Sequence, residues 1–118
     1  MGTHTILVVE DEDESRQVLM QILELEGFTV VGASNGAEAM DYLRTAELPC
    51  LIILDMLMPV MDGRQFRAAL LQAANLAKIP VVVVSALEIS AVADLAVVRA
   101  FRKPLDIDAL VKVVLEYC

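Results

Sequence analysis

The sequence lacks the features that would assign it to a membrane or nucleic-acid-binding class. No apolar run approaches the roughly 18 residues that a membrane helix needs, and no secretory signal precedes the first short apolar run. Lysine and arginine total 9 against 17 aspartates and glutamates, which gives a formal charge of −8. This balance argues against nucleic acid and anionic membranes as partners, because both are bound by clustered positive charge.

Cysteine is also scarce, since Cys50 and Cys118 are the only two in the chain. Their separation matches none of the short spacings that mark metal sites. We therefore interpret both as reduced thiols, in agreement with a cytoplasmic location.

Length and apolar content indicate a single well-filled domain. The 118 residues suffice for one hydrophobic core, so one domain is expected over residues 1–118. Apolar residues make up 58% of the chain, above the usual share of about 45–50%. Such a surplus suits a sheet that helices cover on both faces.

Apolar runs alternate with segments of helical period, which predicts strand–helix units around a parallel sheet. Strands are expected at about 5–9, 28–31, 51–54, from 80 onward, and at 99–102. The helices between and after them are expected at about 13–26, from 35 onward, at 64–74, within 88–97, and from 106 to 117. Right-handed crossovers then give a doubly wound, flavodoxin-like (βα)5 fold of three layers, for which 2-1-3-4-5 is a common strand order.

Polar residues follow four of the predicted strands at their carboxyl ends. Glu10 and Asp11 follow the first strand, Asp55 the third, Ser85 the fourth and Lys103 the fifth. In an open parallel sheet these ends line one crevice, where such folds bind ligands. The combination indicates a site for a divalent cation and a phosphoryl group.

Acidic residues near the start of a helix also have a simpler interpretation as a solvated N-terminus that complements the helix dipole. We accept it for residues 12–14 but not for Glu10 and Asp11, because Asp55 is expected beside them. The Asp-Gly pair at 62–63 is interpreted in the same way as a turn and helix start.

Four short motifs occur in order at the ends of these predicted strands. They are Glu10-Asp11, Asp55 with its tail MLMPVMDG, Ser85-Ala86 and Lys103-Pro104. In this combination the sequence resembles the receiver domain of a two-component response regulator over nearly its whole length. The resemblance implies a signalling domain rather than an enzyme, although such a domain promotes its own phosphorylation and dephosphorylation.

The resemblance implies that Asp55 is the phosphoacceptor. Asp55 would attack phosphohistidine on a partner and become an aspartyl phosphate, in a reaction that depends on positioning and charge neutralisation. The implied cofactor is Mg²⁺, with Mn²⁺ as an alternative ion. Its implied ligands are Asp11, Asp55 and the backbone carbonyl of Leu57, with Glu10 acting through water.

The resemblance also implies roles for the residues that contact the phosphoryl group. Lys103 is expected to pair with Asp55 and then with the phosphoryl oxygens. The Ser85 hydroxyl is expected to hydrogen-bond the phosphoryl group, and Ala86 to leave room for it. A cis peptide bond is expected between Lys103 and Pro104.

The implied phosphodonor is a sensor histidine kinase or a histidine phosphotransfer protein, and the implied output is a downstream effector that the sequence does not identify. No binding of nucleic acid or membrane by this domain is expected. The receiver pattern occupies the chain, so no segment is expected to serve as a DNA-binding effector.

Two departures from the family affect the expected output surface. Lys103 follows Ser85 by 18 positions, fewer than receivers commonly have, so the helix within 88–97 should be short or partly irregular. The aromatic that many receivers carry three positions before the lysine is Ala100 here, and Phe101 should face the opposite side of its strand. We therefore expect partners to contact the first predicted helix and the loops around Asp55 more than the usual output face.

Two other functions were weighed against this interpretation. A pseudo-receiver would bind partners without cycling phosphate; the intact motif residues argue against it, and the short 88–97 region argues for it. A phosphatase of the haloacid dehalogenase type also uses an aspartate after a strand, but needs a second acid two positions later. That position is Leu57 here, which argues against this class.

Overall fold

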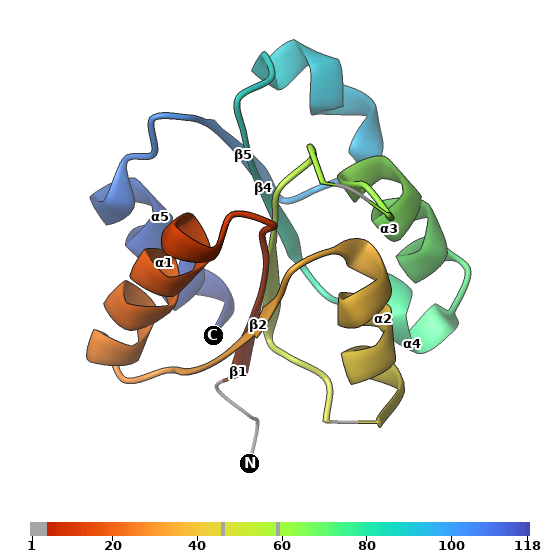
Figure 1. Ribbon diagram of the computed structural model, residues 1–118, viewed down its shortest axis with the longest axis horizontal. Helices are drawn as coiled ribbons and strands as arrows, with labels where there is room; N and C mark the ends of the chain where they lie inside the picture. The colour runs from red at the N-terminus through yellow and green to blue at the C-terminus, as the bar shows by residue number, and fades with distance from the viewer. Residues whose placement is uncertain (1–4, 46, 59) are drawn as a thin grey trace.

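The computed structural model describes residues 5–45, 47–58 and 60–118 and shows a parallel sheet between two helical layers (Figure 1). The strands are β1 (Thr5–Val9), β2 (Thr29–Ala33), β3 (Leu51–Leu54), β4 (Val81–Ser85) and β5 (Arg99–Arg102). The helices are α1 (Asp13–Leu25), α2 (Gly36–Thr45), α3 (Gly63–Leu71), α4 (Ala74–Ala77) and α5 (Ile107–Tyr117), and a 3-10 helix, η1 (Ile89–Leu95), precedes β5. The strand order β2-β1-β3-β4-β5 with parallel pairing confirms the predicted doubly wound, flavodoxin-like fold.

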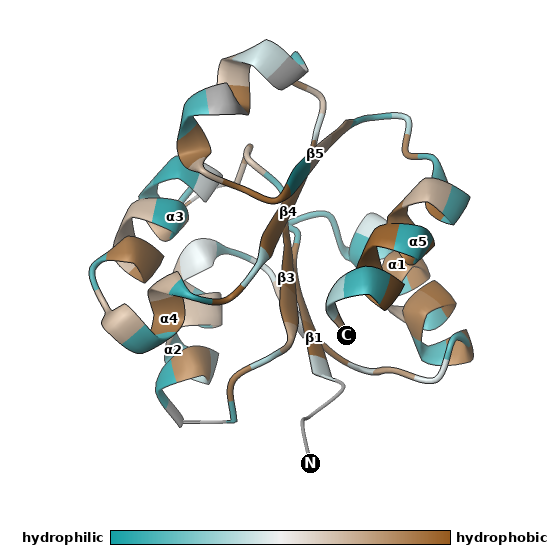
Figure 2. Cartoon of the chain, turned by 180° about the vertical axis from the view of Figure 1, so that it is seen from behind, coloured by the Kyte–Doolittle hydropathy of each residue, from teal (hydrophilic) through white to brown (hydrophobic). Residues whose placement is uncertain are grey.

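The core is divided by the sheet into two apolar clusters. Helices α1 and α5 cover one face, and α2, α3 and α4 cover the other (Figure 1). Alternate residues of β1 serve the two faces: Ile6 and Val8 pack in the α1/α5 cluster, and Leu7 and Val9 in the other. Figure 2 shows the hydrophobic strands enclosed between these helical layers. The polar residues that follow the strands therefore lie at the carboxyl edge of a largely apolar sheet.

The loop after β3 is held close to the start of α3. Asp62 and Gln65 form a capping box at that helix start, which confirms the predicted turn and helix start. Gly63 is required there, because a Cβ atom would lie 2.7 Å from the Met56 Cα and 2.9 Å from the Asp55 carbonyl oxygen. Pro59, within the same tail, lies outside the described residues. This packing fixes the backbone that carries Asp55.

The interpretation of the cysteines as separate thiols is wrong. Cys50 and Cys118 form a disulfide with a Cα–Cα distance of 5.6 Å. The physical reason is the direction of α5, which runs back along the sheet and brings the last residue to the start of β3. The two cysteines are 68 positions apart in sequence, so no local sequence pattern indicates that they pair.

The segment between β4 and β5 is irregular, as predicted. It forms only the seven-residue 3-10 helix η1, and Ala96 after it has a φ of 54°, in the left-handed region. Ala100 packs against the cluster under α3, whereas Phe101 packs against the α1/α5 cluster, which confirms their predicted opposite orientation. The Arg99 guanidinium lies 5.2 Å from the centre of the Phe101 ring.

Candidate functional site

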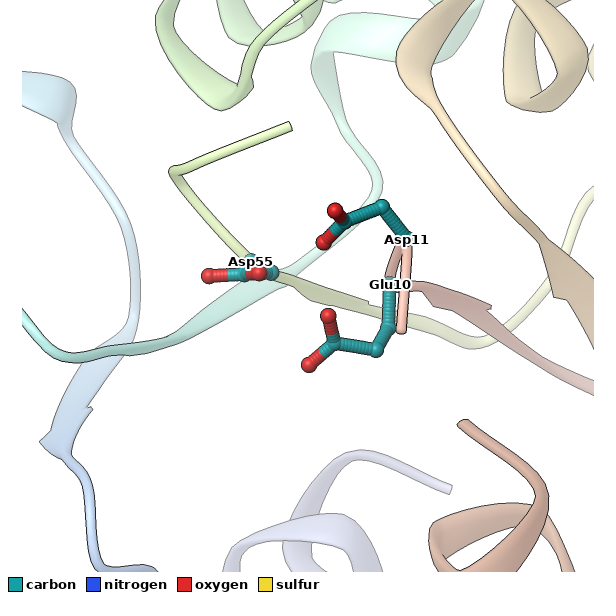
Figure 3. Close-up of side chains that lie close together, drawn as sticks. All are labelled: Glu10, Asp11 and Asp55. Carbon is teal, nitrogen blue, oxygen red and sulfur yellow. The ribbon is translucent and has the colours of Figure 1, made fainter. Parts of the chain in front are cut away.

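Three carboxylates meet where β1 and β3 end. One oxygen from each of Glu10, Asp11 and Asp55 lies within 4.8 Å of the others. Figure 3 shows the three side chains close together, with the carboxyl groups of Glu10 and Asp11, from the end of β1, extending toward Asp55 at the end of β3. Glu10 and Asp55 are buried and Asp11 is exposed, so the cluster opens to solvent on one side.

Lys103 reaches this cluster from the end of β5. Its Nζ donates a hydrogen bond to Glu10 Oε1 at 3.0 Å and lies 3.9 Å from Asp55 Oδ2. The predicted pairing of Lys103 with Asp55 is therefore present only as the longer of two contacts. The peptide bond between Lys103 and Pro104 is cis, as predicted.

The pKa values of Asp55 and Glu10 are shifted in opposite directions. Burial, together with the hydrogen bond to Glu10 and its negative charge, raises the pKa of Asp55 to about 7. Burial also acts to raise the pKa of Glu10, but hydrogen bonds from Lys103 and Asp55 outweigh it, and this pKa lies below its usual value. Glu10 is therefore the more readily ionised of the two carboxylates, and Asp55 ionises across the neutral range in the cation-free site.

The pKa values of Asp11 and Lys103 are also shifted by their surroundings. Slight burial and the neighbouring Glu10 carboxylate raise the pKa of Asp11. Burial acts to lower the pKa of Lys103, but its hydrogen bond to Glu10 and the charge of Asp55 raise it overall. Lys103 therefore stays positively charged over the pH range in which the neighbouring carboxylates titrate.

Ser85 lies at the end of β4, and its side chain is buried. The Leu87 backbone N–H donates to Ser85 Oγ at 3.1 Å, and the Lys103 backbone N–H donates to the Ser85 carbonyl at 2.8 Å. The second bond ties the end of β5 to the end of β4, so the lysine and the hydroxyl are positioned together. Ala86, which follows, is exposed.

Leu57 follows Asp55 in the loop that enters α3. Its backbone N–H points to Asp55 Oδ1 at 3.4 Å, and its side chain is exposed. An exposed leucine two positions after the aspartate supplies no acid or base, which agrees with the argument against a dehalogenase-type phosphatase.

The sequence analysis did not single out Arg16, which also contacts this site. Its Nη1 donates to the backbone carbonyl of Glu10 at 2.8 Å, and its Nη2 lies 2.5 Å from Asp13 Oδ1. The only sequence signal was an arginine three positions after an aspartate in a predicted helix, a spacing that usually marks a surface ion pair.

The donor set suits a hard divalent cation. Carboxylate oxygens are the ligands that Mg²⁺ prefers, and it is usually held by one or two carboxylates while keeping several waters. Burial and the neighbouring Glu10 carboxylate raise the pKa of Asp55, and a bound cation would favour its ionised form. None of the helices in the described part of the chain is long and apolar enough to cross a membrane.

Comparison with known proteins agrees with this site. The family model for the response regulator receiver domain matches residues 6–115, and the chain belongs to this family of two-component signalling domains. The chain is 41% identical to Response regulator Rre1 of Synechocystis over 83 residues, which are 70% of this chain and 36% of that protein. It therefore spans only about a third of that relative's length.

Solved structures share the fold over nearly the whole chain. A response regulator receiver protein from Pseudomonas putida superposes with a TM-score of 0.91 at 28% identity, covering 98% of both chains. The response regulator TrrA from Thermotoga maritima, solved in complex with Mg²⁺ and BeF, has a TM-score of 0.86 at 25% identity, covering 98% of this chain and 100% of its own.

Proposed function

We propose that this chain is a phosphorylation-dependent signalling switch whose phosphoacceptor is Asp55. The observation that carries the proposal is the convergence of Glu10, Asp11 and Asp55 oxygens within 4.8 Å, with the Lys103 ammonium 3.9 Å from Asp55. We also propose that residues 1–118 form one receiver unit that acts in signalling and not as an enzyme on an external substrate.

The chemistry is the transfer of a phosphoryl group from a phosphohistidine to Asp55. An oxygen of the ionised Asp55 carboxylate forms a bond to phosphorus while the phosphorus–nitrogen bond of the donor breaks, and the donor imidazole leaves as the neutral ring with a proton taken from solvent. Lys103 then exchanges its hydrogen bond to Glu10 for one to the phosphoryl oxygens. The buried Ser85 hydroxyl donates to the same group, because its oxygen already accepts from the Leu87 N–H.

The fit of the carboxylates supports Mg²⁺ as the cofactor of this reaction. Asp11, Asp55 and the Leu57 carbonyl would hold it, with Glu10 acting through water, and Mn²⁺ offers similar ligand chemistry. When bound, the ion neutralises the carboxylates and the charge of the transferring group. The complex of TrrA with Mg²⁺ and BeF, a mimic of a bound phosphoryl group, supports the same assignment here.

The proposed donor is a sensor histidine kinase or a histidine phosphotransfer protein, and the output passes to a downstream effector. A groove of about 490 Å³ lies beside the carboxylates, with Glu10 and Lys103 among its lining residues. Its apolar wall comes from α1 and from the segment leading into α5: Val18, Leu19, Ile22, Leu105 and Ile107. This supports the expectation that the partner contacts the first helix while its phosphohistidine meets Asp55.

A cytoplasmic location belongs to the same proposal, since the donor is a kinase partner. The Cys50–Cys118 disulfide is unusual in that compartment, where thiols are generally kept reduced. The disulfide is therefore an observation against a cytoplasmic location.

The proposal is tested by incubating the chain with acetyl phosphate or phosphoramidate and Mg²⁺ and measuring its intact mass. One added phosphoryl group is expected, and Asp55→Asn should not be labelled. Asp11→Ala and excess chelator should each prevent labelling. An unlabelled parent chain would instead support the pseudo-receiver, and labelling of Asp55→Asn would move the phosphoacceptor elsewhere.

A further inference from the structure

We propose that Arg16 is a positioning residue of the cation site, because it fixes the peptide that joins Glu10 to Asp11. This inference rests on the proposed function, since it concerns the same carboxylates. Arg16 lies in the first turns of α1 and contacts neither Asp55 nor the Asp11 side chain in any described interaction.

The contact that carries the inference is the hydrogen bond from Arg16 Nη1 to the Glu10 carbonyl at 2.8 Å. That carbonyl belongs to the peptide plane between the two acidic residues, so fixing it fixes the direction in which both side chains leave the backbone. On the other side of the same residue, the Glu10 N–H donates to the Ala33 carbonyl at 3.0 Å. Both the N–H and the carbonyl group of Glu10 are thus hydrogen-bonded, which holds the backbone of Glu10 and Asp11 in place.

The guanidinium itself is held in place. Asp13 pairs with it at 2.5 Å, and the Arg16 side chain keeps only 15% of its surface exposed. Gly32 of β2 makes room for it, because a Cβ atom there would lie 3.1 Å from Arg16 Cδ and 2.7 Å from Met20 Sδ. An arginine packed against the sheet in this way has lost the freedom that makes most surface ion pairs weak.

Two simpler roles predict different results when Arg16 is replaced. If Arg16 acted only through its positive charge, removing it would tighten the binding of a divalent cation. If Arg16 only stabilised the fold, its removal would lower the melting temperature and leave cation affinity unchanged. A positioning role predicts weaker binding, so the sign of the change separates it from both alternatives.

The test is a calorimetric titration of the unphosphorylated chain with Mg²⁺ at pH 8.5. Arg16→Met is expected to raise the Kd for Mg²⁺ about 10-fold, the loss typical of groups that orient metal ligands. Arg16→Lys, which keeps a donor and the charge, should recover part of the affinity. In labelling by acetyl phosphate, Arg16→Met should raise the half-saturating Mg²⁺ concentration and leave the rate at saturating Mg²⁺ near that of the parent.

The matched control is Arg44→Met. Arg44 forms the same type of pair with Asp41, three residues earlier at 2.8 Å, but both side chains are largely exposed on α2. This variant should bind Mg²⁺ like the parent. Arg16→Gln serves as a second variant; its shorter, neutral side chain should no longer hold the Glu10 carbonyl, so it should weaken Mg²⁺ binding even if Arg16→Met fails to fold.

Unchanged or tighter Mg²⁺ binding in folded Arg16→Met or Arg16→Gln would overturn the positioning role and leave the proposed function intact. A parent chain that neither binds Mg²⁺ nor accepts a phosphoryl group would overturn the proposed function, and the positioning role with it.

Discussion

Lys103 is hydrogen-bonded to Glu10 in this structure, with Nζ donating to Oε1 at 3.0 Å, and its contact with Asp55, the proposed phosphoacceptor, is the longer one. The nearest Asp55 oxygen is 3.9 Å away. This hydrogen bond helps to lower the pKa of Glu10, whereas burial and the neighbouring Glu10 carboxylate raise that of Asp55 to about 7. Phosphorylation would place the larger negative charge on Asp55. Lys103 would then have to leave Glu10 and bind the phosphoryl oxygens.

The first prediction concerns the two effects of this lysine. Lys103→Met removes a positive charge beside the carboxylates, so Mg²⁺ should bind about 3-fold to 10-fold more tightly at pH 8.5. The same change removes the partner of the phosphoryl oxygens, so labelling by acetyl phosphate should be slower. Titration calorimetry and timed mass spectrometry measure the two effects, with Lys112→Met on the exposed side of α5 as control. Weaker Mg²⁺ binding in Lys103→Met would contradict the assignment.

The second prediction follows from the raised pKa of Asp55 in the cation-free chain. Its folded-state pKa of about 7 lies well above the ordinary pKa of an aspartate, so the folded state holds the proton more tightly than the unfolded state. The contribution of this group to stability is full below the unfolded value and is lost as pH rises toward the folded value. Above about pH 7.5 the ionised carboxylate should cost on the order of 3 kcal/mol.

Asp55→Asn removes this cost. Without divalent cations, the variant should be more stable than the parent at pH 8, and the difference should shrink as pH falls to 5. Urea unfolding across this range measures it. Adding Mg²⁺ at pH 8 should stabilise the parent and have little effect on Asp55→Asn. A difference in stability that is constant with pH would show that Asp55 titrates normally.

The third prediction concerns the disulfide between Cys50 and Cys118. It closes a loop over 68 positions and anchors the end of α5 to the start of β3. Restricting the unfolded chain in this way should stabilise the fold by about 2–4 kcal/mol. Urea unfolding of the parent should therefore shift to lower denaturant when a phosphine reductant is added, whereas Cys118→Ser should unfold at the same point with and without it. A parent indifferent to reductant would mean that the thiols are separate in solution.

Much of the site could be predicted because it depends on where buried strands end. The bounds of β1 and β3 follow from apolar runs that stop at an acidic residue, and the parallel topology then brings Asp11, Asp55 and Lys103 to one edge. These positions need only local pattern and the chirality of crossovers.

The features that could not be predicted depend on distances between remote parts of the chain. The disulfide depends on the length and direction of α5, and the hydrogen bond of Lys103 to Glu10 joins residues that are 93 positions apart. The helix expected at 64–74 ends at Leu71 and is followed by the separate turn of α4. No glycine or proline marks that break before Pro80, so the sequence offers no stop signal there.

The last prediction concerns the output of the switch and rests on how η1 is held. Arg67 of α3 is buried, and its guanidinium donates to the carbonyls of Leu95 at 3.0 Å and Ala96 at 2.8 Å. Arg64, one turn earlier, pairs with Asp94 at 3.0 Å. Two arginines of one helix thus tie the end of η1 to α3, in the region where a receiver with a longer helix would have a movable element.

We expect phosphorylation to alter the loops at Asp55 and Ser85 and to leave η1 in place. Ala100 offers no aromatic side chain to rearrange, and Phe101 is packed on the opposite face of the sheet. Amide hydrogen exchange with and without beryllofluoride and Mg²⁺ measures this response. Protection should increase in the loops after β3 and β4, while η1 and β5 should change little.

Arg67→Met provides the decisive comparison. Without the two carbonyl contacts, η1 should exchange faster in the free protein, and beryllofluoride should then alter its protection as well. Arg64→Met, which removes an exposed pair, should have a smaller effect of the same kind. If beryllofluoride instead changes mainly η1 and β5 in the parent chain, these arginines do not hold the segment. Signalling would then pass through the usual face despite the missing aromatic and the short helix.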